Sequence, residues 1–327
     1  MAVSGSGTQA DPYIVDNWDD FLTVSGSSSN YVKFANPDRA ITGDGSSSNP
    51  FVVSTYEEML LKTGASYIHQ VKLIDREAKK YKYGDVYCIY DDTLSTIDFN
   101  DIMPSGYNSD LTIQAHVDFN GWTLKNMAFN RGVLLRFATP SKGLILTNLY
   151  FLGRHSSGWL YIDSVIENFI INMIGVNDDA NSVSVIHTPQ AAGSGIVNSA
   201  LSMKTTGKVH FLGRANNCIL NFEADNTNYF ACGDLVLDNT MATGSLDFEY
   251  SGSVPMFSYI YNSILDFDWK RDSCYPQITR NVMSPSFFNS EKMPSMGMTA
   301  NNLYGATTEQ LKDAQWLYDH GFPIGVD

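Results

Sequence analysis

The chain has 327 residues with a net charge of −14, and 43% of its residues are hydrophobic. It contains 27 Asp but 8 Glu, together with 26 Asn. Because Asp and Asn favour turns whereas Glu favours helices, this composition excludes an all-helical protein. The hydrophobic content excludes a disordered chain. The acidic balance argues against a nucleic-acid partner, because phosphates require clustered Lys and Arg.

The sequence also bears on the compartment. We expect no membrane span, because no window holds about 18 consecutive apolar residues. Residues 1–7 lack a basic region and an apolar region, so we expect no Sec signal peptide. The cysteines lack the CxxC spacing of metal or redox sites, and we interpret them as buried thiols. They are Cys88, Cys218, Cys232 and Cys274.

An internal repeat with one constant offset opens the chain. Three segments recur without a gap: Gly5–Thr8 as Gly43–Ser46, Pro12–Val15 as Pro50–Val53, and Trp18–Leu22 as Tyr56–Leu60. Each copy predicts a glycine turn, a short strand after proline, and a short helix, over residues 17–24 and 55–63. Asp16 and Ser54 are the predicted helix caps. We assign residues 1–80 to these two N-terminal capping units.

The repeat allows two interpretations of its aromatic residues. Trp18 and Tyr56 occupy the same place in both copies. In the first interpretation both are buried against the first coil of the following domain. In the second, one of them faces a partner subunit and forms a docking site.

Short β-rich runs that end in Asn or Asp recur over residues 81–280, about every 24 residues. They end at Asn148, Asn172, Asn198, Asn221, Asp238 and Asp266. The stretches between them carry turn residues instead of a helical apolar stripe, and hairpin signals are scarce. This pattern favours a parallel β-helix over a sandwich or barrel, with Asn at a recurring corner. We predict that Ile170, Ile219 and Ile264 point inward and stack on one another.

The last segment, residues 281–327, changes character. Residues 281–305 carry few strand formers and predict a loop. Thr307 begins a capping-box pattern, and an apolar face over residues 308–320 predicts a helix that ends near Gly321. We expect this helix to cover the last open coil.

Two segments resemble a known family. The opening Gly-x-Gly-Thr pattern, with the strand and helix that follow it, resembles the N-terminal segment of many bacterial and phage right-handed β-helix proteins. Val117–Met127 is similar to a coil of pectin-lyase-like folds, and Leu146–Phe151 looks like the next coil. The resemblance covers roughly residues 1–270 and implies an all-β, right-handed parallel β-helix. Because lyases, hydrolases, adhesins and phage tailspikes share this fold, it does not imply an activity.

Catalytic sets of this family are incomplete in the chain. Asp178-Asp179 resembles the Asp-Asp pair of polygalacturonase-type enzymes, but their Gly-His-Gly and Arg-x-Lys elements are absent. A polar turn explains the pair more simply. The six histidines lack metal-binding spacing. We therefore expect no catalytic residues, no metal and no cofactor.

Other residues are suited to binding a sugar or a receptor. Arg271 and Trp269 follow acids at positions 266 and 268 that share one strand face, which partly matches a pectate-lyase set, although a solvated strand edge explains these acids more simply. Trp159 and Tyr161 form either a surface aromatic platform or an ordinary strand. The candidate glycan- or receptor-facing residues are Trp159, Tyr161, Asp178, Asp179, Trp269 and Arg271.

The sequence as a whole favours a phage virion protein, such as a tailspike, head fibre or collar appendage, that attaches to the host surface. Such a protein is assembled in the host cytoplasm, which accounts for the missing signal peptide. Its expected partners are further copies of the chain, with a trimer fitting a spike or fibre, other virion proteins and a host-surface glycan. The alternatives are a β-helix polysaccharide lyase or hydrolase and a bacterial surface adhesin.

Overall fold

The computed structural model describes most of the chain. The described residues are 3–36, 41–66, 70–91, 95–130, 133–152, 158–176, 183–188, 194–205, 208–227, 230–231, 235–248, 252–255, 257–270, 274–278, 281–295 and 297–322. Within these ranges, no helix is long and apolar enough to cross a bilayer.

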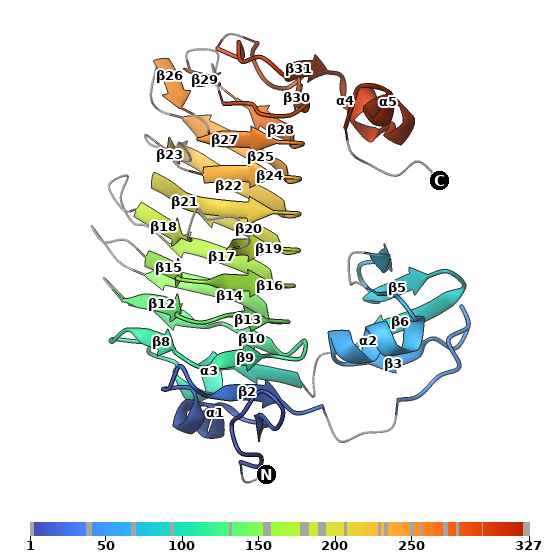
Figure 1. Cartoon of the computed structure of the whole chain (residues 1–327), viewed down its shortest axis with the longest axis vertical. Helices are drawn as coiled ribbons and strands as arrows, with labels where there is room; N and C mark the ends of the chain where they lie inside the picture. Colours follow the sequence, from blue (N-terminus) through green and yellow to red (C-terminus); the bar gives the residue numbers. More distant parts are fainter. Residues whose placement is uncertain are drawn as a thin grey trace.

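The chain folds into a parallel β-solenoid with three faces (Figure 1). Face 1 contains β1 (Tyr13–Val15), β2 (Tyr31–Phe34), β9 (His116–Asp118), β13 (Ser141–Lys142), β16 (Val165–Glu167), β19 (Gly195–Val197), the end of β21 (Lys208–Asn216), β24 (Leu235–Asp238) and β27 (Tyr259–Tyr261). Face 2 contains β7 (Thr96–Asp98), β10 (Thr123–Lys125), β11 (Ala128–Phe129), β14 (Ile145–Leu152), β17 (Ile170–Val176), β20 (Ala200–Thr205), β22 (Ile219–Thr227), β25 (Met241–Phe248), β28 (Ile264–Trp269), β30 (Ser286–Asn289) and β31 (Leu303–Ala306). Face 3 contains β8 (Leu111–Ile113), β12 (Leu134–Phe137), β15 (Gly158–Ile162), β18 (Val183–His187), the first part of β21, and β23 (Phe230–Ala231). A separate two-stranded sheet pairs β26 (Gly252–Pro255) with β29 (Cys274–Gln277).

Asparagine occupies the corner between face 1 and face 2, so the predicted residue type is right, but most of the predicted positions are wrong. Asn198 lies at the corner, whereas Asn172 and Asn221 lie inside β17 and β22. A left-handed backbone turns the chain at the corner, with φ between 44° and 56° at Asn168, Asn198, Asn217, Asn239 and Asn262. Asn tolerates this conformation better than other residues with a side chain. The amide of Asn217 donates to Asn198 (2.6 Å), and the amide of Asn239 donates to Asn217 (3.2 Å). These bonds link successive coils at their tightest bend.

The predicted inward stacking of Ile170, Ile219 and Ile264 is wrong by one residue. Ile219 is 55% exposed, whereas the next residue, Leu220, is fully buried. The left-handed Asn217 directs the residue after it into the core, so the alternation places Ile219 outward and Leu220 inward. Leu220 stacks on its partner in the preceding coil, and Ile171 and Leu265 occupy the equivalent inward positions.

The two N-terminal repeats have the same local structure. Asn17 caps α1 (Trp18–Val24) and Thr55 caps α2 (Tyr56–Thr63), each one residue later than predicted. Gly5 and Gly43 have φ of 89° and 93°, and in each a side chain would overlap the carbonyl oxygen of the following proline. The two copies are therefore a duplicated structural unit of turn, strand and helix, which explains the constant offset between their sequences.

The repeats differ in where they pack. The first joins the solenoid, because β1 pairs with β2 and β2 with β9. Trp18 is buried there, and its indole N–H donates to the Tyr107 hydroxyl (3.0 Å), so the observed arrangement is the one in which Trp18 packs against the first coils. A one-turn helix that was not predicted, α3 (Phe99–Ile102), contributes Phe99 to the same cluster.

The second repeat builds a separate unit, which we call the N-terminal unit (residues 41–91). Its sheet has the order β3 (Phe51–Val53), β6 (Val86–Tyr90), β5 (Lys80–Tyr83) and β4 (Lys72–Asp75). The unit has its own apolar core and packs it on Ile145 of face 2. The Tyr90 hydroxyl also donates to the carbonyl oxygen of Gly121 (3.1 Å).

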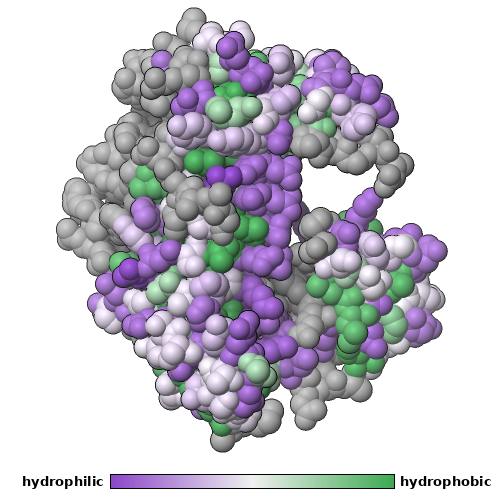
Figure 2. All heavy atoms as spheres, viewed as in Figure 1, coloured by the Kyte–Doolittle hydropathy of each residue, from purple (hydrophilic) through white to green (hydrophobic). Residues whose placement is uncertain are grey.

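The C-terminal segment contains the predicted helix as a pair, α4 (Thr308–Lys312) and α5 (Ala314–Asp319), divided at Asp313. The predicted capping box at Thr307 is present. The pair packs on the outward side of face 2 at Phe287, while Met293 and Met298 from the preceding segment join the main core. That segment, predicted as a loop, includes β30 and β31. An open notch separates the N-terminal unit from the helix pair (Figure 2).

Candidate functional site

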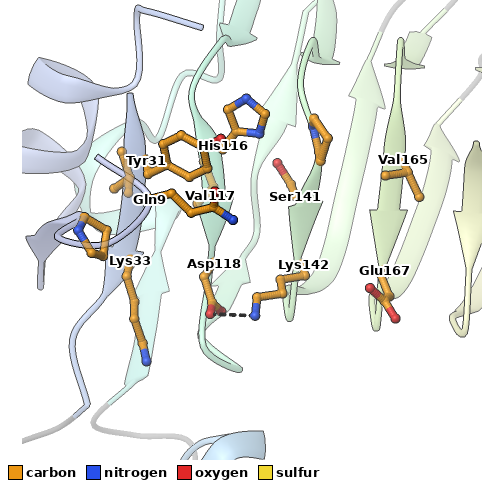
Figure 3. Close-up of a pocket in the computed structure, with 13 residues that line it drawn as sticks. Gln9, Tyr31, Lys33, His116, Val117, Asp118, Ser141, Lys142, Val165 and Glu167 are labelled. Atoms are coloured by element: carbon orange, nitrogen blue, oxygen red, sulfur yellow. Dashed lines mark ion pairs between the residues drawn. The ribbon is translucent and has the colours of Figure 1, made fainter. Parts of the chain in front are cut away.

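A groove of about 530 Å³ crosses the outer side of face 1 near the N-terminal end of the solenoid (Figure 3). Four neighbouring strands, β2, β9, β13 and β16, form its floor. The glycine turn of the first repeat contributes one wall through Gln9 and Pro12. The other lining residues are Tyr31, Val32, Lys33, His116, Val117, Asp118, Pro140, Ser141, Lys142, Val165 and Glu167.

One row of the groove is aromatic and apolar. The rings of Tyr31 and His116 stack with centroids 4.5 Å apart and an interplanar angle of 9°. The two residues are register partners on β2 and β9, so the strand pairing itself aligns the rings. Pro140, directly before β13, and Val165 in β16 continue the row. The result is a flat surface about three strand spacings long, or roughly 14 Å.

A second row of the groove alternates in charge. Lys33, Asp118, Lys142 and Glu167 are successive register partners across the four strands. Lys142 lies 3.1 Å from a carboxylate oxygen of Asp118, as the dashed line in Figure 3 marks. The row therefore offers cationic donors and anionic acceptors in alternation, with no net charge.

The two carboxylates of the groove also maintain the corner of the solenoid. Asp118 accepts a hydrogen bond from the backbone N–H of Asn120 (2.9 Å), and Glu167 accepts one from the Asn198 amide (3.0 Å). These bonds fix the carboxylates in position at the base of the groove.

The residues predicted from the sequence lie elsewhere. Trp159 and Tyr161 are in β15 on face 3, where Tyr161 stacks on His187 with centroids 4.6 Å apart. Trp269 is partly buried at the end of β28 and packs against the main core. Asp178, Asp179 and Arg271 lie outside the described residues, and nothing is described of the Tyr56 side chain.

The structure thus does not join Tyr161 and Trp269 into one site, because they belong to different faces. Sequence reasoning missed the groove. Its residues come from five segments between positions 9 and 167, which only the stacking of coils brings together. The one available signal was the coil motif around Asp118, which marked a fold and not a site.

Two buried thiols in the described part of the chain, Cys88 and Cys218, have low reactivity. Burial raises the pKa of Cys88 to about 11 and that of Cys218 to about 12. A thiol with so high a pKa is not a nucleophile near neutral pH. Within the described ranges, no three His, Cys, Asp or Glu side chains are grouped to hold a metal ion.

Comparisons with known proteins add no assignment: no family model, no curated protein and no solved structure matches this chain.

Proposed function

We propose that this chain is a phage virion appendage protein that attaches to a host-surface glycan, and that the groove on face 1 binds the glycan. The phage assignment is supported by the N-terminal sequence resemblance together with the parallel β-solenoid. The observation that carries the glycan assignment is the stacked Tyr31–His116 platform beside an alternating row of charges.

The two rows suit the two sides of a sugar. The C–H face of a pyranose ring packs on flat aromatic surface, and Tyr31 and His116 provide it. Sugar hydroxyls both donate and accept, so each finds a partner beside Asp118 or Lys142. Binding sites of this kind combine apolar lining with a few fixed polar groups.

The charge of the groove narrows the ligand class. The row of two Lys, one Asp and one Glu is neutral, in a protein of net charge −14. A polyanionic glycan would be repelled by the protein and would gain no net attraction in the groove. We therefore expect an uncharged or zwitterionic glycan whose affinity depends weakly on salt.

Binding without cleavage is the activity the groove supports best. One oxygen of each carboxylate accepts a hydrogen bond of the corner, which fixes its position, and Lys142 lies between the two carboxylates in the register. One observation favours hydrolysis as a second candidate. Asp118 and Glu167 lie two strands apart on the same side of face 1, so their backbones are about 9.6 Å apart, and inverting glycosidases hold their two carboxyl groups about 6.5–9.5 Å apart.

The test starts from a glycan array, which identifies a ligand for calorimetry. Tyr31→Ala should weaken binding of that ligand at least tenfold, because it removes half of the aromatic platform. Tyr161→Ala is the matched control, since Tyr161 belongs to the same kind of Tyr–His stack on face 3. Loss of binding in the control alone would contradict the assignment of the groove.

Two further measurements address the remaining parts of the proposal. Mass spectrometry of purified phage particles should find the chain, and its absence from every particle fraction would refute the virion assignment. A reducing-end assay on the bound glycan should detect no cleavage. Cleavage that disappears in Glu167→Gln would replace binding with hydrolysis.

A further inference from the structure

An apolar stripe runs along the outer side of face 2. Its members are consecutive register partners on eight strands: Thr123, Ile145, Ile170, Ala200, Ile219, Met241, Ile264 and Phe287. Seven of the eight are apolar, although the alternation of the strands directs all of them away from the core. Two residues further along each strand, the corresponding row is polar, as at Asn172, Ser202 and Asn221.

Both ends of the stripe are covered by the chain itself. The N-terminal unit packs on Ile145, and the C-terminal helix pair packs on Ile264 and Phe287. The middle is open: Ile170, Ile219 and Met241 are 39%, 55% and 36% exposed. Contiguous apolar surface of this kind marks an interaction site.

The space over the open part is narrow. Five strand spacings separate Ile145 from Ile264, about 24 Å, and the two covering elements take up part of this length. Figure 2 shows the notch between them. A second solenoid cannot lie flat along face 2, because the N-terminal unit and the helix pair stand on that face. The notch suits a small projecting element.

The N-terminal unit is such a projecting element, and part of its apolar surface is exposed. β4 is the terminal strand of its sheet, and all four residues of β4 are exposed, including Leu73 and Ile74. Leu61 on α2 is also exposed. Hydrophobic side chains gather visibly on this unit in Figure 2. An exposed apolar edge strand is a template for association with another chain.

Charge also favours the N-terminal unit as the occupant. Residues 41–91 contain six Lys or Arg and seven Asp or Glu, a net charge of −1, so the rest of the chain carries −13. The basic residues of the unit are concentrated in the β4–β5 hairpin, at Lys72, Arg76, Lys79, Lys80 and Lys82. This hairpin can approach an acidic solenoid without the repulsion that two solenoids would experience.

We propose that the chain self-associates by docking the β4 edge of its N-terminal unit into the open stripe of a second copy. The contact joins two different surfaces, so it is heterologous. Repetition of it produces a closed ring, such as a trimer, or an open chain of subunits. The inference is independent of the glycan proposal, because it uses neither the groove nor its residues.

Light scattering after size exclusion, from 1 to 100 µM protein, tests the association. The wild-type chain should form oligomers as concentration rises. Ile219→Asp should shift association to at least tenfold higher concentration, and Leu73→Asp should do the same. Asn221→Asp is the matched control, because it places the same charge two residues along β22 in the polar row. Circular dichroism should show that all variants are folded, since each position is on the surface.

A mixing experiment tests the heterologous geometry. Ile219→Asp keeps an intact β4 edge and Leu73→Asp keeps an intact stripe, so a mixture of the two variants should form a heterodimer that neither forms alone. A monomeric wild-type chain at 100 µM would overturn the proposal. So would a mixture that stays monomeric, or loss of association in the Ile219 variant but not in the Leu73 variant.

Discussion

Leu220 and Ile219 are neighbours on β22, and their side chains point in opposite directions. Replacing each by Ala should therefore lower the unfolding free energy by different amounts, more at the inward position than at the outward one. Leu220 is fully buried and stacks between Leu201 and Ala242. Since Ala242 carries only a methyl group, which cannot move into the vacated space, Leu220→Ala should leave a cavity and cost about 3–4 kcal/mol of unfolding free energy. Ile219 is 55% exposed, so less than half of its side chain is buried. Ile219→Ala should therefore lower the unfolding free energy by about 1 kcal/mol.

Urea unfolding followed by far-UV circular dichroism measures both values, at a concentration where the protein is monomeric. The unfolding free energies of the two variants should differ by about 2 kcal/mol or more, with unchanged m-values. Equal costs, or a larger cost at Ile219, would refute the orientation of β22 described above. Ile219→Asp should fold for the same reason, whereas a carboxylate at Leu220 would be buried without a partner.

Asn217→Ala should cost about 1–2 kcal/mol because Ala resists the left-handed corner, while Asn217→Gly, which loses only the ladder bonds, should cost less in the same urea titration. In a variant whose only thiols are Cys88 and Cys218, alkylation at pH 8 should be slow until urea unfolds the protein; rapid labelling of the folded state would contradict their burial. The backbone N–H of Thr308 donates to Glu291 (2.9 Å) and holds the pKa of that carboxyl below its usual value. Its stabilisation of α4 is therefore present above the ordinary carboxyl pKa and is lost as pH falls through the lowered one. Tryptophan fluorescence should report this acid transition in the wild type but not in Glu291→Gln.

The architecture was predictable because its signals are local. The repeat, the use of Asn at a corner and the capping box at Thr307 each act within a few residues, and the structure contains all three, although Asn198 is the one predicted run end that lies at the corner. Which residues of each strand point inward was not predictable. In an Ile-Leu or Ile-Ile pair, either residue can face the core without breaking the alternation of inward and outward positions. Only the left-handed Asn217 fixes the phase, and the sequence does not state which asparagines turn the chain.

Local sequence patterns could not predict the candidate site either, for a related reason. The corner asparagines are unevenly spaced along the chain, and the segment from Asn168 to Asn198 is much longer than the one from Asn198 to Asn217. Because coil length varies this much, counting along the chain does not reveal which residues of neighbouring coils become register partners. The groove and the outer stripe both consist of such partners, so neither is visible before the coils are stacked.

Hydrogen–deuterium exchange in the presence of the glycan identified on the array tests the central claim most directly, because it locates the ligand on the folded chain. We expect slower exchange in β2, β9, β13 and β16, with the strands of face 3 unchanged and the glycan recovered at its original length. Protection confined to face 3 around β15 and β18, or a glycan shortened during the incubation, would contradict it.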